Sequence, residues 1–285
     1  MDEINKLYSE MTTKELLALA ESGDLEAQFR LAGRYKKGKG IRKSLSKAFE
    51  WYAKAAKQGN MAAQFNLGAC YYMGYGVEQD YKKALEWYFK AAEQGDSWSQ
   101  NDIGICYLDG YGIEKDPVKG VEWITKAAIQ GYATAQFNLA QCYMDGKGVE
   151  QCCKKAVEWY TKAAEQGNLW AQNNLGICYQ YGDGVRKNYK KAVMWYTKAA
   201  EQGSDKAQYH LGYCFEKSLG VEKDLVKAVE WYTKAAIQGD PWAQNHLAAC
   251  YEFSKGVKKS YNKAVQWYTK VSVSMPSGSS PAPSL

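Results

Sequence analysis

The 285-residue chain is poor in histidine and proline, and charged residues interrupt every apolar run before it is long enough to cross a membrane. Its N-terminal sequence, MDEINKLYSEMTTKELLALA, is acidic at its start and lacks the basic segment and apolar run of a secretory signal. Without such a signal, the eight Cys are expected to be reduced thiols. We therefore expect a protein of the cytoplasm or the nucleus.

The patterns of the common catalytic and cofactor sites are also missing. The two His, His210 and His246, stand 36 residues apart with no further Cys or His at ligand spacing, so no zinc site is predicted. The chain has no nucleotide-binding G-x-x-x-x-G-K-S/T loop. Cys152 and Cys153 are adjacent, have no His near them in sequence and do not predict a catalytic thiol. The sequence thus predicts no catalytic residue, no metal and no cofactor, and we expect a protein that is not an enzyme.

Aromatic residues are abundant, with 23 Tyr and 10 Trp, and their spacing reveals an internal repeat. Seven Trp follow one another at intervals of 36 residues, and a Gln and a Tyr or Phe recur in the same phase. The Trp are Trp51, Trp87, Trp123, Trp159, Trp195, Trp231 and Trp267. The chain therefore divides into seven units, at residues 24–59, 60–95, 96–131, 132–167, 168–203, 204–239 and 240–271.

Each unit has the pattern of two helices joined by a short turn. In the unit at 168–203, Asn168 and Asn188 stand where helix caps are expected, and apolar residues follow each at spacings of three and four. Gly182 and Gly184 form the turn, and Gly203 supplies a left-handed stop. In the fourth unit Cys152 replaces the capping residue, so the helix after it is expected to start weakly.

One two-helix unit is too small to bury its apolar face, whereas seven stacked units form a continuous core. We predict an all-α protein, an α/α right-handed superhelical solenoid of seven 36-residue helix-turn-helix repeats. Residues 1–23 are expected to form an N-terminal capping helix. Residues 272–285, SVSMPSGSSPAPSL, are expected to be a disordered tail.

The pattern W-Y-x-K-A-A-x-x-G followed by A-Q-x-x-L-G-x-x-Y-x-x-G-x-G-V resembles the Sel1-like repeat, a relative of the tetratricopeptide repeat. This resemblance covers residues 24 to about 271 and implies an adaptor that gathers other proteins into complexes. A secreted, cysteine-rich branch of the family carries a Cys pair in each repeat and includes members linked to penicillin binding. A hydrolase or penicillin-like small-molecule binder of that type is the alternative function, although the Cys pair is missing here. A passive spacer is a third alternative.

One Cys per unit stands directly before the core Tyr or Phe. Equivalent points on stacked helices lie about 8–10 Å apart, which exceeds the roughly 4.4–6.8 Å between Cα atoms that a disulfide allows. These residues are therefore interpreted as core thiols. They are Cys70, Cys106, Cys142, Cys178, Cys214 and Cys250.

Two rows of Lys recur on the second helices, one of them running from Lys54 to Lys270. Glu residues such as Glu50 precede Lys of this row by four positions, an arrangement that favours ion pairs on a helix surface. We interpret these rows as a solvated outer face, with an electrostatic partner surface as the alternative.

By analogy with tetratricopeptide repeats, the first helices are expected to line a concave groove through positions 3, 6, 10, 13 and 14 of each unit. In the second to fifth units, the only charged residues at these positions are Asp109 and Asp145, so nucleic acid, which requires Lys or Arg, is not the expected partner. We expect a protein or peptide partner instead, without membrane insertion. The candidate partner-binding residues are Phe65, Tyr72, Trp98, Asn101, Asp109, Phe137, Asp145, Trp170, Asn173, Tyr181, Tyr209, Trp242 and Asn245.

Three Trp outside the framework, Trp98, Trp170 and Trp242, each precede an Asn by three residues. Aromatic anchors beside amides suit an extended peptide, because amides can bond its backbone while rings take its side chains. Packing between neighbouring units, or duplication of Trp-x-x-Asn without selection for binding, explains the same pattern. The sequence leaves these alternatives open, and it does not specify the oligomeric state.

Overall fold

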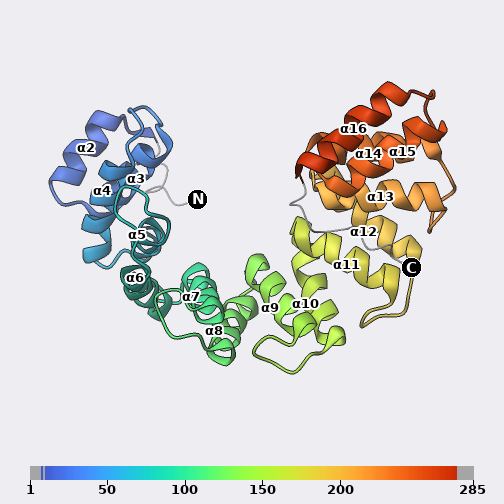
Figure 1. Cartoon of the computed structure of the whole chain (residues 1–285). Helices are drawn as coiled ribbons and strands as arrows, with labels where there is room; N and C mark the ends of the chain where they lie inside the picture. The colour runs from blue at the N-terminus through green and yellow to red at the C-terminus, as the bar shows by residue number, and fades with distance from the viewer. Residues whose placement is uncertain (1–7, 9, 275–285) are drawn as a thin grey trace. The chain divides into compact units, whose positions relative to one another are not determined.

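The computed structural model describes residue 8 and residues 10–274, and every regular element in that part of the chain is a helix (Figure 1). Helix α2, Thr13–Glu21, precedes the repeats. The first helices of the seven repeats are α3 Leu25–Lys37, α5 Met61–Met73, α7 Ser97–Asp109, α9 Ala133–Asp145, α11 Leu169–Tyr181, α13 Asp205–Lys217 and α15 Pro241–Phe253. The second helices are α4 Leu45–Lys57, α6 Tyr81–Glu93, α8 Pro117–Ile129, α10 Cys153–Glu165, α12 Tyr189–Glu201, α14 Leu225–Ile237 and α16 Tyr261–Ser274.

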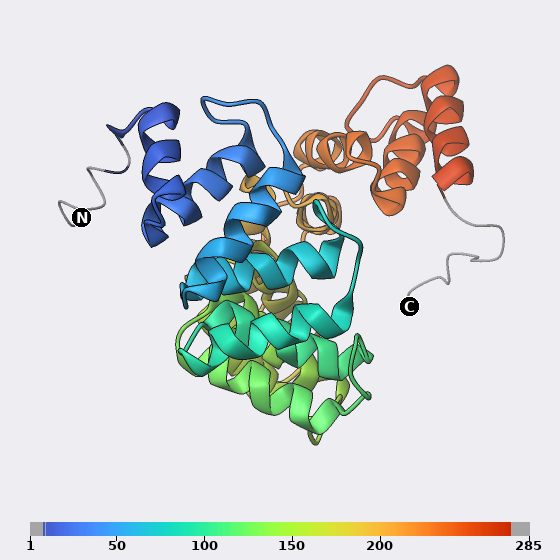
Figure 2. The ribbon, with the colours of Figure 1, turned by 90° about the vertical axis from the view of Figure 1, so that its left-hand side faces the viewer.

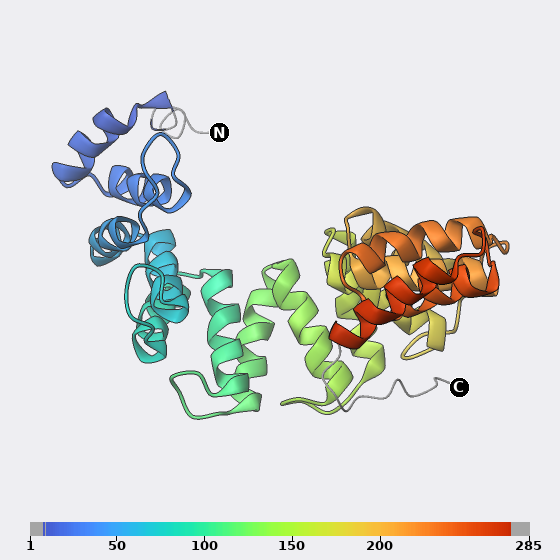
Figure 3. The ribbon, with the colours of Figure 1, turned by 45° about the horizontal axis from the view of Figure 1, so that its top comes forward.

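The chain forms two compact units, residues 1–151 with helices α2–α9 and residues 152–285 with helices α10–α16. Within each unit, every helix packs against the next one along the chain, as Figure 2 shows for α2–α9 and Figure 3 for α15 and α16. The predicted all-α fold of seven helix-turn-helix repeats is confirmed. Helix α16 extends to Ser274, so residues 272–274 are helical rather than part of the expected disordered tail, and residues 275–285 lie outside the described residues.

Side-chain caps begin most of the helices. Asn168 accepts a hydrogen bond from the backbone N–H of Ala171. In the fourth repeat, Cys152 makes no side-chain cap bond, as expected, and Tyr132 makes none either. Both helices of this repeat therefore begin without the stabilisation of about 0.5–2 kcal/mol that a cap provides.

The two glycines of each turn have different structural roles. Gly182 ends α11 in the left-handed region, with a φ of 89°. Gly184 also has a positive φ, and a Cβ there would lie 2.2 Å from the carbonyl oxygen of Cys153. The second glycine therefore lets the turn approach the start of the preceding repeat's second helix. At the position of the first glycine, the sixth and seventh repeats have Ser218 and Ser254, whose φ values of 57° and 55° are uncommon outside glycine.

In most repeats a glutamine pair joins the repeat to the helix before it. Gln64 is buried, and its Nε2 donates to the carbonyl oxygen of Ala56 at the end of the preceding repeat, at 3.3 Å. Gln94, at the end of the same repeat's second helix, donates to Gln64 Oε1 at 2.7 Å and to the carbonyl oxygen of Gly59 at 3.1 Å. The pair thus adds side-chain bonds to carbonyls at the end of the preceding repeat, of which that of Ala56 also accepts from the backbone N–H of Gly59. The same side-chain bond joins Gln58 to Gln28, Gln130 to Gln100, Gln202 to Gln172 and Gln238 to Gln208.

The Lys of the row from Lys54 to Lys270 lie over the rings of the seven repeated Trp. Lys54 Nζ is 3.8 Å from the centre of the Trp51 ring, and Lys234 Nζ is 3.9 Å from that of Trp231. The expected partners were Glu residues four positions earlier, whereas the structure places each ammonium group three positions after a Trp and above its ring. A cation over an aromatic face contributes about 0.5–1 kcal/mol at an exposed site. These Lys therefore contribute to the stability of the repeats through the Trp rings.

A column of polar residues runs beside the core at position 7 of the repeats. The first helices of the second, fourth and fifth repeats have Asn66, Asn138 and Asn174 there, whereas the third has Asp102. Asn101 Nδ2 donates to Asp102 Oδ1 at 3.1 Å. Burial raises the pKa of Asp102 to about 6. This carboxylate is therefore ionised at neutral pH at a cost in stability.

The six ladder thiols are buried, and none of the eight Cys forms a disulfide. Burial raises their pKa values, to about 11 for Cys70 and about 12 for Cys214, whereas Cys152 and Cys153 are half-exposed. Because the thiolate is the reactive form, the native protein should react rapidly at two thiols and show the other six only after denaturation. Time-resolved titration with a thiol reagent without reductant measures both phases. The C152S/C153S variant should lose the fast phase, and fewer than eight thiols after denaturation would contradict the free-thiol assignment.

Replacing Asp102 by Asn, the residue at this position in three other repeats, should stabilise the protein. A carboxyl pKa that is raised in the folded state favours folding below the unfolded value of 3.8, and this contribution is lost as pH rises through about 6. D102N should therefore raise the free energy of unfolding at pH 7 by about 1–3 kcal/mol, and this gain should shrink towards pH 4. Urea denaturation at both pH values measures it. Asp145→Asn removes the same charge from an exposed site and serves as the control; equal effects of the two variants would contradict the prediction.

Candidate interaction surface

In residues 1–151, the surface formed by positions 3, 6, 10, 13 and 14 of the first helices, called here the first-helix surface, carries a half-exposed Trp. The side chain of Trp98 is 51% exposed. Its ring contacts Phe65 of the preceding repeat edge-on, at 5.3 Å between ring centres, and lies 6.1 Å from the ring of Tyr132 in the following one. Trp98 thus spans neighbouring repeats and still presents about half of its surface to solvent.

The Asn that follows Trp98 belongs to the framework. Asn101 is 2% exposed, accepts a hydrogen bond from Asn138 Nδ2 at 2.8 Å, and donates to Asp102. Its equivalent in the fifth repeat, Asn173, is also buried and donates to Asn174 Oδ1 at 3.2 Å. The amide Nδ2 groups of Asn101 and Asn173 therefore donate within the protein in this structure. Asn245 is exposed.

The remaining candidates of this unit differ in exposure. Phe65, Tyr72 and Phe137 are half-buried, and Tyr72 packs with Tyr81 and Tyr111 at 5.1 and 5.9 Å between ring centres. The carboxylate of Asp109 pairs with Lys147 of the next repeat at 2.9 Å. Asp145 is exposed. Lys147 therefore neutralises the charge of Asp109.

In residues 152–285, the same positions carry four exposed aromatic side chains. Trp170 is 58% exposed, Tyr181 is 59% exposed, Trp242 is 39% exposed and Phe253 is 63% exposed. These large rings stand on α11 and α15, which are fixed by buried Ala and Leu residues of the repeat framework. Exposed aromatic side chains on a rigid scaffold are the type of residue that anchors protein partners.

The sequence did not predict a cluster of polar side chains around Glu216, which is 9% exposed. Glu216 accepts from the hydroxyl of Tyr232 at 2.8 Å and lies 3.3 Å from His246 Nδ1, while His246 Nε2 lies 3.4 Å from the hydroxyl of Tyr209. The hydrogen bond with His246 holds the Glu216 pKa well below its usual range. The signal in the sequence is a His at position 7 together with an acid at position 13 of the preceding repeat.

The order of Glu216, His246 and Tyr209 has the form of a proton relay. A nucleophile in such a relay is activated by a lowered pKa or by an adjacent base. Burial instead raises the pKa of Tyr209 well above its usual value, so the hydroxyl stays protonated. Tyr209 also packs against Tyr232, at 5.9 Å between ring centres. The cluster therefore holds the half-buried ring of Tyr209 in place on the first-helix surface.

His210 occupies the same position as His246 one repeat earlier, and the two differ in their surroundings. The His210 ring stacks on Tyr196 at 4.9 Å, and burial lowers its pKa to about 4. In the part of the chain that the structure describes, no group of three or more His, Cys, Asp or Glu is arranged to hold a metal ion. No helix within the same residues has the length and apolarity to span a membrane.

Comparisons with known proteins agree with this architecture. The family model described as Sel1 repeat matches residues 25–60, 62–96, 99–132, 133–168, 171–204, 205–240 and 243–270. No curated protein sequence was found to match the chain.

Solved structures give a second comparison. A protective antigen with an SLR fold, c5321 of uropathogenic Escherichia coli, is 37% identical with a TM-score of 0.84; the match covers 93% of this chain and 56% of that one. The chain thus spans little more than half the length of the antigen. A Sel1 repeat protein of Oxalobacter formigenes is 35% identical, with a TM-score of 0.75 and coverage of 93% and 77%. Repeats of this type generally serve as scaffolds for protein–protein interactions. From its seven matched repeats and these similarities, the chain belongs to the Sel1 repeat family.

Proposed function

We propose that the chain is a non-enzymatic adaptor that binds partner proteins through the first-helix positions of each compact unit. The observation that carries the proposal is the exposure of Trp98, Trp170 and Trp242 on helices whose other faces are buried. A buried Trp in a well-packed interface is a common source of binding energy, and its loss typically costs 2 kcal/mol or more.

The chemistry of the surface favours an aromatic or aliphatic segment with a modest positive charge. Asp145 is an exposed carboxylate, while Lys147 already pairs with Asp109. Asn101 and Asn173 are buried, so Asn245 is the exposed one of the three Asn residues that follow these Trp. The proposed recognition therefore rests mainly on the aromatic side chains.

The alternative of a cysteine-rich-type hydrolase or penicillin-like binder has less support. That branch depends on a Cys pair in each repeat, whereas here the six ladder thiols are single, buried and free. The relay-like cluster of Glu216, His246 and Tyr209 ends in a hydroxyl whose pKa is raised. Both observations favour the adaptor.

The triple variant W98A/W170A/W242A should lose peptide binding while remaining folded. Peptides selected from a random library on the parent protein provide the ligands, and titration calorimetry measures their affinity. We expect these peptides to bind the triple variant at least about tenfold more weakly, because each ring is a hot-spot anchor. Because the rings are only half-buried, each substitution should cost about 0.5–1.5 kcal/mol of stability, compared with roughly 3–5 kcal/mol for a core Trp.

A matched control removes exposed apolar side chains elsewhere. I129A/I237A/V265A truncates side chains on the second helices that are 72%, 72% and 62% exposed, and it should bind the selected peptides like the parent. If the selected peptides bind the Trp variant as tightly as the parent, the proposed surface is wrong.

A further inference from the structure

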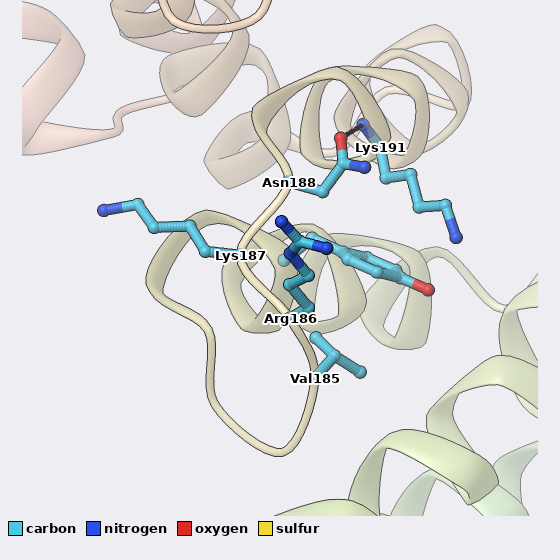
Figure 4. Close-up of a pocket in the computed structure, with 6 residues that line it drawn as sticks. Val185, Arg186, Lys187, Asn188 and Lys191 are labelled. Carbon is cyan, nitrogen blue, oxygen red and sulfur yellow. Dashed lines mark hydrogen bonds between the residues drawn. The ribbon is translucent and has the colours of Figure 1, made fainter.

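A basic cavity lies between the two helices of the fifth repeat, and none of the residues that line it stands at a position of the first-helix surface. It has a volume of 520 Å³ and is lined by Tyr179, Val185, Arg186, Lys187, Asn188 and Lys191 (Figure 4). Its lining includes three cationic side chains and no acidic one. In Figure 4, Lys187 extends away from Arg186 and Lys191, so the latter two are the cations that a ligand would meet together.

The turns of three other repeats carry negative charge that this turn lacks. In the second, third and sixth repeats the second helix begins at an Asp whose carboxylate pairs with the Lys three residues later, at 3.1 Å for Lys83, 3.0 Å for Lys119 and 3.3 Å for Lys227. The fifth repeat has Asn188 instead, which keeps the cap bond from the backbone N–H of Lys191 at 3.0 Å and supplies no negative charge. Lys191 Nζ lies 5.1 Å from the centre of the Tyr179 ring, much as Lys83 and Lys227 lie 5.7 and 5.5 Å from the rings at the equivalent position of their repeats.

A second replacement in the same turn acts in the same direction. Two positions before the cap, the second, third and sixth repeats have Glu78, Glu114 and Glu222, whereas the fifth has Arg186. Relative to the sixth repeat, Glu→Arg and Asp→Asn make this turn three charge units more positive while the helix keeps its cap. The first and seventh repeats also have basic residues and a Ser cap in this turn. Both acidic and basic turns therefore occur in this fold.

We propose that the cavity of the fifth repeat binds a phosphate group. Arg186 offers a planar fork of N–H donors that matches phosphate oxygens, and Lys191 adds a second, compact positive charge. A volume of 520 Å³ is in the range of small-molecule sites and leaves room for the group that carries the phosphate. The ligand is then a phosphate ester, carried by a protein side chain or by a small metabolite, or it is the free phosphate anion.

Titration calorimetry with the full chain at pH 7.5 tests the proposal, using inorganic phosphate and O-phosphoserine as probes at constant ionic strength. Tighter binding of O-phosphoserine assigns the site to a phosphate ester, and equal or tighter binding of inorganic phosphate assigns it to the free anion. Binding should strengthen as pH rises through about 6, where phosphate gains its second negative charge while Arg and Lys stay charged. Added KCl should weaken it.

The sixth repeat supplies a matched variant. R186E/N188D gives the fifth repeat the residues that the sixth has at these two positions, so it should fold, as circular dichroism and thermal melting will verify. We expect its affinity for the better probe to fall at least about tenfold, because it loses a charge-assisted contact and restores a carboxylate beside Lys191. W98A/W170A/W242A should bind the probe like the parent, which separates this site from the first-helix surface. Failure of both probes to bind the parent, or equal affinity for parent and R186E/N188D, would overturn the proposal.

Discussion

A buried glutamine of the first helix donates to a backbone carbonyl at the end of the preceding helix. In most repeats it also accepts a hydrogen bond from a second glutamine, at the end of the repeat's own second helix. Gln64 reaches the carbonyl of Ala56, and Gln94 bonds to both Gln64 and Gly59, so one pair connects two repeats in a defined register. A two-helix unit cannot bury its own apolar face, so stability depends on this contact with the neighbour. The second glycine of each turn depends on the same register, because its backbone touches the preceding repeat. With this framework fixed, side chains at the outer positions of the helices are free to differ between repeats.

Most of the fold could be predicted from the sequence, because its causes are local and recur seven times. The helix starts at Asn168 and Asn188, the left-handed ends at glycine and the core thiols all follow from residue types at fixed spacing. Contacts between repeats could not be predicted in this way. Asn101 accepts a hydrogen bond from Asn138, and Asp109 pairs with Lys147, in each case across two repeats. Lys54 lies over the Trp51 ring because of side-chain geometry that the spacing of residues does not specify.

The candidate interaction surface shows the same division. Exposure of Trp98, Trp170 and Trp242 agrees with the periodicity of the first helices, since position 3 lies outside the apolar stripe. The cluster of Glu216, His246 and Tyr209 required side chains from successive repeats to meet, and no spacing within one repeat indicates it. Internal repetition helps in another respect. A substitution that copies the residue of a sibling repeat has already been accommodated by an equivalent backbone, so charge can be altered with little risk to folding.

The missing caps of the fourth repeat have a consequence for cooperativity. In a linear array each repeat contacts only its neighbours, so unfolding can begin at a weak repeat and spread to the next one. Helices α9 and α10 begin at Tyr132 and Cys152 without a side-chain acceptor. Because each missing cap costs about 0.5–2 kcal/mol, the fourth repeat is expected to open more readily than its capped neighbours. Unfolding can then begin inside the array as well as at its two ends.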